Sequence, residues 1–133
     1  MLQKTSLHAL DIKIRELLVS IQERRAGLVS VNCVREMRRF LLKMHDSCTN
    51  ISDPEFIATL RSRIIFECRL KEWEMYAEID GNTKCLTLCS MNTFTLQSIS
   101  CNLNLKNLDV SDYNQSLTNF FHIIENNTVM DRT

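Results

Sequence analysis

Apolar residues recur every three or four positions near the start of the chain, a spacing that places one stripe along a helix. The first stripe begins at Leu7 and predicts a helix over residues 6–25. Arg24 then takes a position on the stripe, and Gly27 follows, which weakens a helix interior by ~1 kcal/mol relative to alanine. The stripe is therefore disturbed near these two residues, where the helix either ends or continues past a stammer. The stripe residues that we expect to contact a partner are Leu7, Leu10, Ile14, Leu17 and Ile21.

A second stripe resumes in a new phase and predicts a helix over residues 32–48. Residues 6–48 would span ~65 Å as one rod, and such a rod cannot bury its apolar stripe alone. Two arrangements stay open: the two helices fold back on each other within one domain, or they pair with another protein as in a coiled coil. The apolar members of this second stripe are Val34, Met37, Leu41, Met44 and Cys48.

A third helix is expected from Pro54 onward. Ser52 or Asp53 can accept a hydrogen bond from an exposed amide, and proline suits the first turn of a helix. The residues that would give this helix a broad apolar face are Phe56, Ile57, Leu60, Ile64, Ile65, Phe66 and Cys68.

The apolar period then changes from about 3.6 to 2, which predicts strands. Residues 73–79 alternate as a half-buried strand with an acidic outer face, and Asp80-Gly81 signals a hairpin turn. The return strand is expected over residues 84–90, and a third run of apolar residues covers 94–105. The alternation slips within this run, so we expect a bulge or corner near residues 97–98.

A closing helix is predicted after Ser111 or Asp112, either of which can cap it. The predicted fold is α+β: long, coiled-coil-like N-terminal helices, then a three-stranded antiparallel meander packed by helices. The expected division is a helical segment over residues 1–50, a small α+β globule over 51–125 and a disordered tail over 126–133. The apolar face of the closing helix holds Leu117, Phe120, Phe121 and Ile124.

Composition narrows the range of functions. The 133 residues carry 16 basic and 16 acidic side chains, with nine basic and five acidic residues in positions 1–50 and an acidic excess afterwards. With no apolar run for a signal peptide or a membrane helix, we expect a protein of the nucleus or cytoplasm that contacts no membrane. Its six cysteines are then expected to be reduced, and its two glycines are too few for a phosphate-binding loop.

Two groups of reactive side chains invite a catalytic or metal site. Cys85 and Cys89, with Cys101 and His122 downstream, contain zinc-ligand types. However, Cys85 and Cys89 lie ~13 Å apart if the strand is regular, too far for one metal ion. The run His45-Asp46-Ser47-Cys48 holds the residue types of nucleophilic catalysis, but neighbours on a helix point in different directions. We therefore expect no enzyme activity, metal or cofactor.

A basic stripe is the most informative charge feature. Positions 35, 39 and 43 fall in line on the face of the second helix away from its apolar stripe. Such a stripe is a candidate contact for phosphates, an acidic chain or a dimer partner, although an ordinary solvated helix face is the more common explanation. Its residues are Arg35, Arg38, Arg39 and Lys43.

The order of elements resembles that of RWD-like kinetochore proteins. The resemblance rests on the acidic strand and turn of residues 72–81, on Cys85-Leu86-Thr87-Leu88, on the run 94–105 and on the closing Leu117-Thr118-Asn119-Phe120-Phe121. In particular the chain is similar to the small coiled-coil-plus-globule subunits of the outer-kinetochore microtubule-attachment complex. This resemblance implies a chromosome-associated role in cell division and assigns no individual functional residue.

Two function hypotheses follow. The first is a non-enzymatic scaffold subunit that pairs through its helical seam with a protein partner in a hetero-oligomer. The alternative is a nucleic-acid-associated or host-modulating accessory protein that acts through the basic helix. Salt separates the two, because binding to phosphates weakens steeply between ~50 and 200 mM salt and an apolar seam does not.

Overall fold

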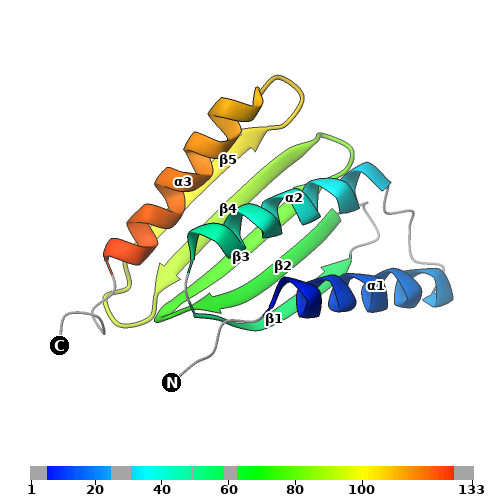
Figure 1. Ribbon diagram of the computed structural model, residues 1–133, viewed down its shortest axis with the longest axis horizontal. Coiled ribbons are helices and arrows are strands. Elements are labelled where there is room, and N and C mark those ends of the chain that lie inside the picture. The colour runs from blue at the N-terminus through cyan, green and yellow to red at the C-terminus, as the bar shows by residue number, and fades with distance from the viewer. Residues whose placement is uncertain (1–5, 25–30, 49, 59–62, 128–133) are drawn as a thin grey trace.

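The computed structural model describes residues 6–24, 31–48, 50–58 and 63–127. Two helices are followed by five strands and a closing helix (Figure 1). The helices are α1 (Leu7–Arg24), α2 (Val31–Ser47) and α3 (Val110–Asn126). The strands are β1 (Ile51–Ala58), β2 (Arg63–Leu70), β3 (Trp73–Asp80), β4 (Cys85–Asn92) and β5 (Ser98–Asn104).

The five strands form one antiparallel sheet in which every strand pairs with its neighbours in sequence, in the order β1-β2-β3-β4-β5. The three helices lie on one face of this sheet (Figure 1). α1 contacts β1, α2 contacts β2 and β3, and α3 contacts β5 and α2. The described part of the chain is thus a two-layer α+β structure in which no described helix lies over the other face of the sheet.

The core lies between the two layers. Alternate residues of β3 point inward, so Trp73, Met75, Ala77 and Ile79 are buried while Glu74 is exposed. The helices contribute Leu10 from α1, Phe40 from α2 and Phe121 from α3, and the rings of Phe40 and Phe121 lie 5.9 Å apart. Each large apolar side chain that is fully buried stabilises the fold by ~1.5–3 kcal/mol. All three helices therefore share one core with the sheet.

The predicted three-stranded meander is wrong, because the segment expected to form the third helix is the hairpin of β1 and β2. In β2 the inward positions are Ile64, Phe66, Cys68 and Leu70, an alternation of period two. Isoleucine and phenylalanine favour strands, and β3 satisfies the backbone of β2 by pairing with it. The helical spacing read from Phe56 onward arises by chance from two strands of opposite direction.

The predicted long, coiled-coil-like helices are also wrong. α1 and α2 have 18 and 17 residues and lie on the sheet as two separate helices. Their apolar stripes exist, with Leu10, Met37, Leu41 and Met44 all fully buried, but the sheet of the same chain covers them. The spacing correctly located both helices, and it could not reveal what their apolar faces contact.

The later elements follow the sequence more closely. The predictions of β3, of β4 and of a closing helix are confirmed. The predicted caps Ser111 and Asp112 are wrong, because α3 begins at Val110 and the side chain of Asp109 caps it by accepting from the backbone N–H of Asp112 at 2.7 Å. Two residues expected in the third strand, Phe94 and Leu96, lie instead in the turn before β5, where they are 65% and 69% exposed. Most of the expected tail, residues 128–133, lies outside the described residues.

Candidate functional site

The helical seam that was expected to meet a partner is largely covered within the chain. Leu10 and Ile14 are 0% and 4% exposed, and Leu7 packs partly buried against the same core. Leu17 and Ile21 belong to α1, but their side chains lie outside the described part of the molecule. The described seam residues therefore offer little apolar surface to another protein.

Two residues of the basic stripe on α2, Arg38 and Arg39, contact other residues of the chain. Arg38 donates to the carboxylate of Asp11 in α1 at 3.1 and 3.4 Å. Arg39 pairs with Glu36 at 3.5 Å, and its guanidinium lies 3.7 Å from the ring centre of Tyr113 in α3. The contacts with Asp11 and Tyr113 fix α2 against its two neighbouring helices, whereas the pair with Glu36 lies within α2.

The other two basic residues lie apart from these contacts. Arg35 is exposed and lines a cleft of about 430 Å³ with Lys84 and Lys106, while Lys43 is half-buried. The four basic residues thus do not form one uncommitted surface.

The cysteines considered as zinc ligands lie on different faces of the sheet. Cys89 pairs with Ser100 on the outer face, whereas Cys101 pairs with Leu88 and packs against the core on the inner face. His122 stands on the exposed side of α3, where its Nε2 lies 2.7 Å from the side-chain nitrogen of Asn126. Within the described residues no group of three or more histidine, cysteine or acidic side chains is placed to hold a metal ion.

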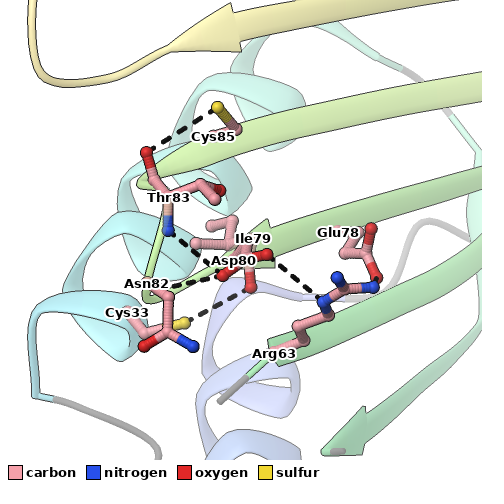
Figure 2. A network of polar contacts seen from close by, with 8 residues as sticks. All are labelled: Cys33, Arg63, Glu78, Ile79, Asp80, Asn82, Thr83 and Cys85. Carbon is pink, nitrogen blue, oxygen red and sulfur yellow. Dashed lines mark hydrogen bonds and ion pairs between the residues drawn. The ribbon is translucent and has the colours of Figure 1, made fainter. Parts of the chain in front are cut away.

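Polar contacts fix the turn between β3 and β4 (Figure 2). The carboxylate of Asp80 accepts from the backbone N–H groups of Asn82 and Thr83 at 2.9 and 3.3 Å. These hydrogen bonds, with the Asn82 bond largest, lower the pKa of the Asp80 carboxyl. Arg63 reaches Asp80 at 3.3 Å and Glu78 at 3.5 Å. Arg63, Glu78 and Asp80 are therefore paired with one another within the fold.

The thiol of Cys33 adds a contact between the layers at the same end of the sheet. It donates from α2 to the carbonyl oxygen of Ile79 in β3 at 3.5 Å (Figure 2). Burial raises the pKa of the Cys33 thiol to about 11. Cys33 is therefore a protonated structural thiol at neutral pH.

The outer face of the sheet is acidic over its first three strands. Glu55 and Glu67 lie directly opposite each other on β1 and β2, and Glu74 and Glu78 project from β3. Two arginines, Arg63 and Arg69, balance only part of this charge. A shallow depression of about 630 Å³ crosses this face and is lined by Glu67, Tyr76, Cys89, Met91 and Ser100.

The two edges of the sheet differ in protection. Natural proteins prevent unwanted pairing at sheet edges with proline, charges and β-bulges. β1 has all three: Pro54, the charges of Asp53 and Glu55, and a register shift between Ser52 and Glu55. The backbone of Asp53 has a positive φ of 52°, which bends the strand away from an extended path.

β5 has none of these features. Its seven residues, Ser98–Asn104, contain no proline and no charge, and their pairing with β4 runs without a register shift. Among the described residues no strand pairs with its other side. β5 is therefore an unprotected edge.

The direction of the β5 backbone groups follows from two backbone hydrogen bonds at the ends of the strand. Leu105 donates to the carbonyl of Lys84, and the carbonyl of Gln97 accepts from Asn92, both at 2.9 Å. Because antiparallel residues alternate between facing the partner strand and facing away, the odd-numbered residues of β5 bond to β4. The backbone groups that face outward are then those of Ser98, Ser100, Asn102 and Asn104.

One flank of α3 adjoins this edge. Successive helix residues are rotated ~100° about the axis. Phe121, in contact with Phe40, marks the side toward α2; Ile123 lies two residues further and so on the opposite side, 38% exposed. Half-buried Ser116 lies on the same side of α3 as Ile123. We define the β5 edge surface as Ile123 and Ser116 together with the outward backbone groups of β5.

This surface was missed at the sequence level although the chain contains a signal for it. Residues 85–124 include only three charged side chains, Lys106, Asp109 and Asp112, whereas residues 51–80 include eleven. The interiors of protein interfaces are depleted of charge, so this contrast favours an interface on the β4–β5–α3 side.

Comparison with known proteins gives no match: no family model, no curated protein and no solved structure is similar to the chain. The resemblance to RWD-like kinetochore proteins stays a prediction, and so does the nuclear or cytoplasmic location expected from the lack of an apolar run. No described helix has the length and apolar character that crossing a membrane requires.

Proposed function

We propose that the chain is a non-enzymatic interaction module that binds a protein partner through the β5 edge surface. The observation that carries this proposal is the unprotected β5 edge in a sheet whose other edge is protected by proline, charge and a bulge. An open edge of this kind pairs readily with another chain.

The surroundings of the edge support the same function. On the flank of α3 that holds Ile123, the described polar side chains include Ser116 and Asn119, which carry no charge. Covering such uncharged groups costs less hydration free energy than covering charged ones. The basic stripe of α2 is the weaker candidate, because Arg38 and Arg39 already have partners within the chain.

The test is capture of partners from an extract of the native cells by the immobilised chain. Ile123→Lys places a charge on the β5 edge surface, and Leu42→Lys places one on an apolar residue of α2 that is 47% exposed. Stoichiometric partners should be retained by the wild type and by Leu42→Lys and lost by Ile123→Lys. Equal retention by all three proteins would remove the basis of the proposal, provided circular dichroism shows that each variant is folded.

A further inference from the structure

We infer that the β5 edge accepts one extended segment of another protein as a sixth strand, with apolar side chains at alternate positions. This inference rests on the proposed function and specifies how the partner is bound. The observation behind it is the row of backbone N–H and C=O groups that face away from β4 and continue the hydrogen-bonding pattern of the sheet. They belong to Ser98, Ser100, Asn102 and Asn104. Main-chain hydrogen bonds supply affinity in strand addition, and side chains at alternate positions supply specificity.

The side chains of the added strand would meet two different surfaces. On the helix side they face Ile123 of α3 and the half-buried Ile99 and Cys101 of β5, which are apolar. On the outer side they lie beside the hydroxyl and amide side chains of Ser100 and Asn102, which are exposed. The matching segment therefore has apolar residues at every second position and uncharged polar residues between them.

An apolar turn extends this surface at the start of β5. Phe94 and Leu96 are 65% and 69% exposed, among the most exposed large apolar residues in the described part of the chain. They directly precede the edge strand, so a bound segment longer than β5 would continue over them. Such a segment gains apolar contacts beyond the sheet.

A second copy of this chain does not fit the same place. α3 runs along β5 and contacts it, as Figure 1 shows. Antiparallel pairing of β5 with β5 of a second copy would set two α3 helices over strands ~4.8 Å apart, whereas packed helices need 8–10 Å. The occupant is therefore a strand that carries no helix on this face.

The probe is a library of random twelve-residue peptides displayed on phage and selected on the full chain. We expect enriched peptides with apolar residues at every second position. Their binding should fall about tenfold or more in Ser100→Pro, because proline removes an outward N–H worth ~1 kcal/mol and its ring obstructs the edge. Ser100→Ala keeps the backbone and is the matched control, with binding within about twofold of wild type. Peptide binding should also slow amide exchange at Ser98, Ser100 and Asn102.

Three outcomes would overturn this inference: no enriched peptide, peptides that bind Ser100→Pro as well as wild type, or a wild-type dimer in sedimentation that Ser100→Pro dissociates. Asn102→Pro serves as a second edge variant if Ser100→Pro is unfolded. Retention of the native partner by Ile123→Lys and by Ser100→Pro distinguishes a failure of strand addition from a failure of the proposed function. If Ile123→Lys loses the partner and Ser100→Pro keeps it, the interaction surface stands and strand addition falls. If both keep it, the proposed function falls as well.

Discussion

The two edges of the sheet are treated differently by the same chain. At β1 the backbone is bent by a bulge, Pro54 lacks a donor, and acidic side chains stand along the strand. At β5 the strand is regular and uncharged, and its outward amides and carbonyls pair with no other described strand. This difference is the basis of our proposal that the second edge pairs with a partner, because an edge without such protection is free to pair with another chain. We therefore infer the function of this edge from the absence of proline, charge and a bulge in β5.

The largest expected effect tests which way the β5 backbone faces. Cys101→Pro removes an N–H that bonds to β4 and should lower the free energy of unfolding by about 3 kcal/mol or more. Ser100→Pro removes an outward N–H and should cost about 1 kcal/mol or less, as proline is tolerated at strand edges. Urea denaturation of both variants measures the difference. Equal losses would mean that our assignment of inward and outward residues is wrong.

The next effect compares a thiol of the interior with one beside the β5 edge. The pKa of Cys33 rises from 9.0 to about 11 on folding, since burial disfavours the thiolate. The contribution of the protonated Cys33 thiol to folding stability is therefore fully present below pH 9 and is lost as the pH rises toward 11. We expect the stability advantage of wild type over Cys33→Ser to shrink by about 2 kcal/mol across this range.

Cys101→Ser is the matched control for this alkaline titration. Burial also raises the pKa of the Cys101 thiol, but its side chain is only half-buried. The same pH range should therefore change the difference between wild type and Cys101→Ser by less. A larger change for Cys101 than for Cys33 would contradict the burial assigned to the β5 edge.

A smaller effect concerns Arg39 and Arg38 of α2, which already form contacts within the chain. Arg39→Gln should destabilise the chain by about 1 kcal/mol, because Arg39 lies over the ring of Tyr113 and pairs with Glu36. Arg38 is 58% exposed in its pair with Asp11, so Arg38→Gln should cost under about 0.5 kcal/mol. Thermal unfolding of the two variants decides their order, and a reversed order would count against the structural role of Arg39.

The smallest effect comes from giving β5 the protection that β1 has. The double substitution Ser100→Lys with Asn102→Lys adds charges on exposed side chains of the outer face, so stability should change by less than about 0.5 kcal/mol. Aggregation at high concentration, followed by light scattering, should decrease. A clear loss of stability would show that these side chains are engaged in the folded chain.

The sequence predicted much of this fold because period and turn chemistry act locally. The helical stripes located α1 and α2, and alternation located β3 and β4. The residues from Pro54 onward were predicted as a helix because apolar residues recur at helical spacing, although Phe56 and Ile57 lie on β1 and Ile64 lies on β2. Only pairing with distant residues, such as Phe66 opposite Ala77, distinguishes these alternatives.

The candidate site was harder to predict because it depends on which strand has no neighbour. The helical seam and the basic stripe are patterns of side chains, and both are used largely within the chain, as Leu10 and Arg38 illustrate. An open edge consists of backbone groups, which every residue carries. Its one sequence signal, the scarcity of charge in residues 85–124, becomes meaningful only once β5 is known to end the sheet.

The most direct test of the central claim is amide hydrogen exchange along β5 in the free chain, measured residue by residue by NMR. If the edge is open and the backbone is oriented as described, Ser98, Ser100 and Asn102 exchange quickly while Ile99, Cys101 and Leu103 exchange slowly. Uniformly slow exchange along the strand would mean that the edge is already covered, and would contradict the account.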